Sequence, residues 1–260
     1  MRAVLAALAL LASLARAQSG LTRPQVGFMQ DAANSFRPVY GIAGNFLPGD
    51  AVTGKVVSAA YSGSYGLVKT SSAIIVTDRT GSIVASYSAA DGPALFAFTH
   101  SGEPALAFMP AANTLLAWDG AAFNPAPFDP STLGASVVLS IGEPHPGHAA
   151  MIVQGADGLW DVRVQLATGA IDSQAAIPGI TGPVLMLAND ELVYSDVNGI
   201  VLRSSDRTEL HINAQLPASF TLQQMGDGWI QLRDLGSSRQ FAIRITRNRE
   251  QYYQLPEGGQ

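Results

Sequence analysis

The chain has 260 residues, a formal net charge of −5 and no cysteine. The missing thiol excludes disulfides, thiolate metal sites, thiol catalysis and cofactors held through cysteine. Nucleic acid is an unsuitable partner, because phosphate binding needs clustered positive charge and this chain is acidic.

The first seventeen residues have the layout of a secretory signal peptide. Arg2 supplies a positive start, an apolar run covers residues 3–14, and Ala15-Arg16-Ala17 fits the cleavage pattern. An uncleaved membrane anchor is the alternative, but roughly twelve apolar residues are too few to cross a bilayer core of ~30 Å as a helix. We therefore expect residues 1–17 to be removed, leaving a secreted or periplasmic chain without a membrane span.

The first strands expected after this leader form a lone hairpin, Val26–Gln30 and Phe36–Ile42. Pro38 lies in its second strand and has no N–H to offer a ladder, which favours an edge position. The hairpin is interpreted either as an incomplete blade or as strands that pair with the last unit and close a ring.

Five repeated units follow this hairpin. Apolar residues alternate along the strands, as where Phe241, Ile243 and Ile245 share one face. Hairpin turns recur in three registers at roughly 42-residue intervals, which describes a repeated four-stranded antiparallel meander. The units are expected at residues 56–90, 94–125, 137–176, 184–213 and 220–255.

This period and strand count predict an all-β fold, a β-propeller of about five or six four-stranded blades that occupies residues 18–260 as one domain. A β-sandwich or an open β-repeat array is the alternative. The meander and the segment Phe36-Arg37-Pro38-Val39-Tyr40-Gly41-Ile42-Ala43-Gly44 resemble the secreted bacterial β-propeller-like repeat proteins. The resemblance implies this fold and an extracytoplasmic setting. It implies no catalytic residues, because the blades lack a G-H…W-D signature or a kelch double glycine.

The densest polar cluster contains Glu143, His145 and His148. A His-x-x-His spacing beside a carboxylate is able to ligate zinc, copper or nickel. Two prolines and a glycine exclude the helix that would gather these side chains, so a solvated hairpin tip is favoured. We expect no metal and no other cofactor.

An apolar excursion at residues 120–136 interrupts the repeat. Its prolines stiffen the chain, so ordering it on a partner costs little entropy. Phe123 and Phe128 are the candidate partner-contact residues. An ordinary long loop is the alternative.

Other signals of chemistry are missing from the sequence. No G-x-S-x-G elbow and no phosphate-binding glycine loop occur. We therefore favour a non-enzymatic binding or scaffolding protein for an unidentified protein or glycan partner. A glycan-acting hydrolase or lyase is the alternative and requires two carboxylates within about 10 Å at one end of the ring. A self-associating envelope protein is a third reading, and the oligomeric state stays open.

Overall fold

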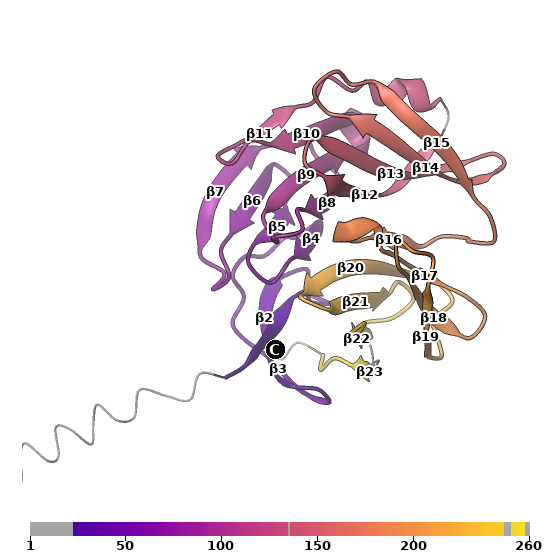
Figure 1. Cartoon of the computed structure of the whole chain (residues 1–260). Coiled ribbons are helices and arrows are strands. Elements are labelled where there is room, and N and C mark those ends of the chain that lie inside the picture. Colours follow the sequence, from indigo (N-terminus) through magenta and orange to yellow (C-terminus); the bar gives the residue numbers. More distant parts are fainter. Residues whose placement is uncertain (1–22, 135, 247–250, 258–260) are drawn as a thin grey trace, which may run out of the picture.

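The computed structural model describes residues 23–134, 136–246 and 251–257, so the predicted signal peptide at residues 1–17 lies outside the described residues. Six antiparallel sheets follow one another around a centre in chain order (Figure 1). The last sheet returns beside the first, which makes the molecule a six-bladed β-propeller. This is the larger of the two blade numbers expected, and it excludes a sandwich or an open array.

The blades are numbered 1 to 6 in chain order. Blade 1 has three strands, and blades 2 to 6 have four each. Blades 1 to 3 consist of β1 (Gln25–Gln30), β2 (Phe36–Ile42), β3 (Asn45–Pro48); β4 (Ser58–Tyr61), β5 (Gly66–Lys69), β6 (Ala73–Thr77), β7 (Ile83–Ser88); β8 (Leu95–Phe98), β9 (Pro104–Met109), β10 (Thr114–Trp118) and β11 (Phe123–Pro125). Blades 4 to 6 consist of β12 (Val137–His145), β13 (His148–Gly155), β14 (Gly158–Gln165), β15 (Ile171–Ile177); β16 (Val184–Met186), β17 (Leu192–Ser195), β18 (Gly199–Arg203), β19 (Glu209–Asn213); β20 (Phe220–Gly226), β21 (Trp229–Asp234), β22 (Gln240–Arg244) and β23 (Gln251–Gln254). Three short 3-10 helices connect strands: η1 (Pro110–Ala112), η2 (Pro130–Leu133) and η3 (Ala188–Asp190).

All five predicted repeat units are confirmed as four-stranded blades. The third unit, expected at 137–176, is blade 4, which runs from Val137 to Ile177. The alternating apolar side chains of these strands fill the space between neighbouring sheets. Leu115 of blade 3, for example, shares a fully buried cluster with Met151 and Val164 of blade 4. The period-2 pattern therefore gave both the strands and the faces that they bury.

In each complete blade the first strand is innermost (Figure 1). Serine side chains join two pairs of these inner strands. Ser58 Oγ donates to the Ala94 carbonyl oxygen at 2.8 Å, which links blade 2 to blade 3. Ser140 Oγ accepts from the Met186 N–H at 2.8 Å, which links blade 4 to blade 5. Such bonds satisfy buried backbone groups that the ladders leave over.

Blade 1 has no innermost strand among the described residues. The start of β1 lies beside the end of β4, because Gln25 Nε2 and the Tyr61 hydroxyl both donate to the Arg79 carbonyl oxygen. The end of β1 lies beside the residues that precede β4 in the chain, because Gln30 Nε2 donates to the Val56 carbonyl oxygen at 2.9 Å. β1 is therefore antiparallel to the inner strand β4, and this is the direction that the second strand of a blade has. The inner strands β20 and β4 contact each other beside β1.

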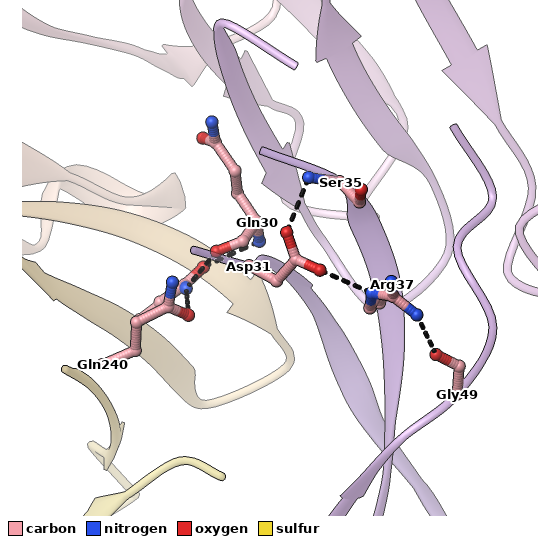
Figure 2. A network of polar contacts seen from close by, with 7 residues as sticks. Gln30, Asp31, Ser35, Arg37, Gly49 and Gln240 are labelled. Carbon is pink, nitrogen blue, oxygen red and sulfur yellow. Dashed lines mark hydrogen bonds and ion pairs between the residues drawn. The ribbon is translucent and has the colours of Figure 1, made fainter. Parts of the chain in front are cut away.

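The expectation that Pro38 occupies an edge strand is wrong. β2 lies between β1 and β3, so it is the middle strand of blade 1. The Pro38 carbonyl accepts from the Gly49 N–H at 2.8 Å, but the proline has no N–H with which to complete that pair. Arg37 Nη1 donates to the Gly49 carbonyl oxygen at 3.1 Å and replaces the missing donor (Figure 2). A neighbouring guanidinium therefore allows a proline inside the sheet.

The ring closes through a side-chain amide and not through a shared strand. The Gln30 N–H donates to Gln231 Oε1 at 3.1 Å, and Gln231 Nε2 donates to the Gln30 carbonyl oxygen at 2.8 Å. Gln231 is fully buried and its Nε2 also donates to Gln240 Oε1 at 2.7 Å. Blade 1 is therefore an incomplete blade, and it meets blade 6 without backbone ladder pairing.

Candidate functional site

A cavity of about 390 Å³ occupies the centre of the ring. It lies toward the end where the inner strands begin, since Val57, Pro93 and Pro183 line it just ahead of β4, β8 and β16. The inner strands of blades 2 to 6 supply most of its wall, and their lining side chains are mainly apolar. Its size is at the lower end of the ~300–1,000 Å³ typical of small-molecule sites.

The described residues that line the cavity include no aspartate, glutamate, histidine or lysine. Arg233 is the one charged side chain among them. The glycan-hydrolase alternative required two nearby carboxylates at an end of the ring, and the described cavity wall supplies none. The site has the composition of a binding cavity with a single cationic position.

Arg233 lies on the side of blade 6 that faces blade 1, where the described residues include no inner strand. Arg233 lies on β21, a second strand, and Gln30 lies at the end of β1, also in second-strand position. Both line the cavity, together with five inner strands. The inner strand β20 lies between β21 and the centre, so the Arg233 side chain reaches the cavity on the side of blade 6 that faces blade 1. The space beside blade 1 is therefore a polar notch, defined by Gln30 and Arg233, in a mainly apolar wall.

Arg233 has little compensation for its charge. Its Nη2 lies 3.4 Å from Asn34 Oδ1, and among the described residues it forms no ion pair. Burial lowers the pKa of the Arg233 guanidinium, while the more distant Asp31 carboxylate opposes that shift. Burying part of a guanidinium costs desolvation free energy, which is offset only when an anion or another hydrogen-bond acceptor pairs with it.

Asp31 is committed to another partner. It is 2% exposed, its Oδ1 accepts from the Ser35 N–H at 2.7 Å, and its Oδ2 accepts from Arg37 Nε at 2.5 Å (Figure 2). This pair fixes the turn between β1 and β2 and positions Arg37 for the Gly49 carbonyl. The carboxylate of Asp31 is therefore neutralised within blade 1.

A second hollow, of about 560 Å³, lies at the opposite end of the ring between blades 1, 2 and 6. Arg79 and Arg244 line it, but so does the carboxylate of Asp227. The Arg244 guanidinium lies 5.5 Å from the centre of the Trp229 ring, a cation–π distance. Burial raises the pKa of Tyr61, which also lines the hollow, to about 12. Its charges are mixed, unlike those of the central cavity.

The candidate metal ligands lie in one hairpin of blade 4, as expected. Glu143 and His145 are at the end of β12 and His148 begins β13, directly opposite His145. His148 Nε2 is 3.6 Å from Asp172 Oδ2, and burial raises the pKa of the Glu143 carboxyl. Within the described ranges no three potential ligand side chains gather around a common point.

The two candidate partner-contact residues serve packing. Phe128 is 5% exposed and belongs to the cluster between blades 3 and 4. Phe123 lies on β11, where its ring centre is 5.0 Å from that of Trp118 and 6.0 Å from that of Tyr87. Partner contact by this excursion stays a prediction, and neither phenylalanine offers it an exposed ring.

Gln30, Gln231 and Arg233 were not predicted as functional residues from the sequence. Their own signal was ordinary: Ile230-Gln231-Leu232-Arg233 alternates like any half-exposed strand. In the structure Gln231 is fully buried against blade 1, and Arg233 faces the cavity. Their place beside blade 1, whose described residues include no inner strand, sets these polar residues apart from the others.

No family model matches the sequence, and no curated protein matches it either. Solved structures do resemble the fold. A chain of the nidogen/laminin complex has a TM-score of 0.54 at 11% identity, over 88% of this chain and 92% of that one. The WD40 domain of Neurospora crassa Pan2 has a TM-score of 0.44 at 10% identity, over 91% and 81%. The β-propeller domain of Myceliophteria thermophila Cps50 (Swd1) has 0.44 at 11% identity, over 92% and 88%.

The chain is a β-propeller. Likeness at such low identity shows the fold alone and brings no activity with it. The expected resemblance to β-propeller proteins is confirmed at that level. In the described part of the propeller no helix has the length and apolar character needed to cross a membrane.

Proposed function

We propose that this propeller is a non-catalytic binding protein of the cell exterior or periplasm, and that it holds its ligand in the central cavity. The composition of the cavity wall carries the proposal. The described lining is mainly apolar and contains no titratable side chain except Arg233. General acid–base or nucleophilic catalysis needs at least one group that exchanges protons near neutral pH, and an arginine does not.

Two further observations support binding over a purely structural role. The cavity is framed by the first strands of five blades, so its shape is held by the whole ring. Its mouth carries exposed apolar side chains, with Val57 38% and Leu235 58% exposed. No observation favours the hydrolase or lyase alternative. The extracytoplasmic location rests on residues 1–17 of the sequence alone.

Binding in the cavity is tested with N-phenyl-1-naphthylamine, a neutral apolar dye that fluoresces when it leaves water. Thr221 is exposed on β20, lines the cavity and lies opposite Arg233 in the ladder. Thr221→Trp fills the mouth, and we expect it to weaken dye binding at least tenfold. Ser173→Trp is the matched control, because Ser173 is equally exposed on the outer strand β15.

Saturable binding at one dye per chain, lost in Thr221→Trp and kept in Ser173→Trp, supports the proposal. Circular dichroism and thermal melts establish that both variants fold. Absence of saturable binding to the unmodified protein, or equal binding by the two folded variants, overturns it.

The location has its own test. Expression of the full chain in a bacterial host, followed by fractionation and N-terminal sequencing, is expected to yield a periplasmic or secreted protein that begins at Gln18. Recovery in the cytoplasm with residues 1–17 intact would contradict the extracytoplasmic proposal and leave the cavity test unaffected.

A further inference from the structure

The central cavity combines a mainly apolar wall with a single cationic side chain. Its wall is mainly apolar around blades 2 to 6, and on the side of blade 6 that faces blade 1 it presents a single half-buried guanidinium. Isolated charges are normally kept from apolar surroundings unless a partner neutralises them. Among the described residues Arg233 has only the distant amide oxygen of Asn34, at 3.4 Å.

The nearby polar groups cannot supply the missing anion. Asp31 is held by Arg37 and the Ser35 N–H. The Gln30 side-chain amide donates to Asn34 Oδ1 at 3.1 Å and to the Val56 carbonyl oxygen at 2.9 Å, so it is also committed. Among the described residues, the notch therefore holds one positive charge without an ion-pair partner at the edge of a mainly apolar volume.

We infer that the cavity takes a small molecule with an apolar body and one carboxylate or sulfonate group. The anionic group lies against Arg233 in the notch beside blade 1, and the apolar body lies among the inner strands of blades 2 to 6. A planar guanidinium suits this role, because its N–H groups pair with both oxygens of such an anion at once. This inference rests on the proposed function and deepens it.

A matched pair of dyes tests the inference. N-phenyl-1-naphthylamine and 8-anilinonaphthalene-1-sulfonate share one aromatic body, and only the second carries an anion. We expect the sulfonate to bind the unmodified protein at least tenfold more tightly than the neutral dye. Arg233→Gln is expected to abolish this ratio, and Arg233→Lys to restore part of it, since a lysine keeps the charge without the planar fork.

Arg207→Gln is the control for general loss of positive charge, because Arg207 is exposed in the turn between β18 and β19. It is expected to keep the ratio of the unmodified protein. If neutral dye binds in the cavity but the sulfonate gains nothing, or if Arg233→Gln keeps the ratio, the inference is overturned and the proposed function stands. If neither dye binds in a manner sensitive to Thr221→Trp, the proposed function fails as well.

Competition with the sulfonate dye then distinguishes two classes of ligand, a fatty acid and a peptide carboxyl terminus. Decanoate and acetyl-leucyl-phenylalanine both carry an apolar body and one carboxylate, and decanol serves as the uncharged counterpart of the first. Displacement of the sulfonate dye by decanoate, but not by decanol or the peptide, assigns a fatty-acid-like ligand. Displacement by the peptide alone assigns a peptide carboxyl terminus, and failure of both carboxylates to displace the dye overturns the inference.

Discussion

Blades 1 and 4 are stabilised in two different ways. Blade 4 has four strands of seven to nine residues, and its faces are packed with apolar side chains. Blade 1 has three strands and no inner strand among the described residues, contains the buried carboxylate of Asp31, and shares a network of buried amides with blade 6 (Figure 2). Blade 4 is stabilised mainly by the apolar surface that it buries. Blade 1 is stabilised by specific polar bonds and by close packing of its backbone against blade 6.

The difference has a functional consequence. The described residues of blade 1 include no inner strand, and Arg233 of blade 6 lines the cavity on the side that faces blade 1. This position gives a mainly apolar cavity its single charge. The junction of blades 1 and 6 depends on a few residues, so it is expected to be more sensitive to substitution than blade 4.

Gly27→Ala is expected to have the largest effect. A Cβ at Gly27 would lie 1.6 Å from the Met225 carbonyl oxygen, so the backbones of β1 and β20 would have to separate. We expect the free energy of unfolding to fall by about 3 kcal/mol, measured by urea denaturation. Gly155→Ala in blade 4 is the control, since its Cβ would meet nothing closer than the Trp160 ring at 3.6 Å. Equal effects of the two substitutions would remove the contrast between the blades.

Gln231→Leu removes the amide that closes the ring. It leaves the N–H and carbonyl of Gln30 buried without their partner, at a cost of roughly 2 kcal/mol in the free energy of unfolding. Gln174→Leu, on an exposed position of β15 in blade 4, is expected to change stability by less than about 0.5 kcal/mol. A Gln231→Leu protein as stable as the Gln174→Leu control would show that the amide is dispensable.

Arg37→Met and Arg163→Met compare an ion pair whose carboxylate is buried with ion pairs whose carboxylates are partly exposed. Arg37→Met leaves Asp31, which is 2% exposed, without its cation, and we expect a loss of about 2 kcal/mol. Arg163→Met breaks pairs with Asp161 and Asp190, whose side chains are 22% and 27% exposed, and is expected to cost less than about 1 kcal/mol. Chemical denaturation of both variants measures the difference, and the reverse order would contradict it.

The smallest effect concerns alkaline pH. Burial raises the pKa of Tyr61 to about 12, above the ordinary value of about 10 for an unfolded chain. Its contribution to stability is therefore complete below pH ~10 and is lost as pH rises toward 12, because only the unfolded state then ionises readily. Tyr61→Phe is expected to make the decline in urea midpoint between pH 9.5 and 11.5 shallower. Tyr194 and Tyr252, also raised to about 12, retain part of that decline.

Most strands of this fold were predictable from the sequence, and so were the limits of its units. The unit expected at 184–213 has those limits in the structure, and the others differ by a residue or two. β3 was missed because Asn45-Phe46-Leu47-Pro48 is too short to show an alternation and ends in a proline. The place of Pro38 was misjudged because the donor that replaces its N–H comes from a side chain.

The site was not predictable in the same way. The histidines of blade 4 stand out in the sequence, but the cavity is lined by residues that look like ordinary strand positions. Gln30 and Gln231, whose amide groups close the ring, are 201 positions apart. A pattern that repeats every two residues reports which face of a strand is apolar, and it carries no information on such distant contacts.

The sequence by itself determined an all-β repeat, five four-stranded units and a hairpin ahead of them, because alternation and turn chemistry act over a few residues. The tertiary structure alone decided that this hairpin belongs to a three-stranded blade, that Gln231 closes the ring, and that Arg233 faces the central cavity. These depend on how the first and last blades meet, and that geometry arises only when the two ends of the chain come together.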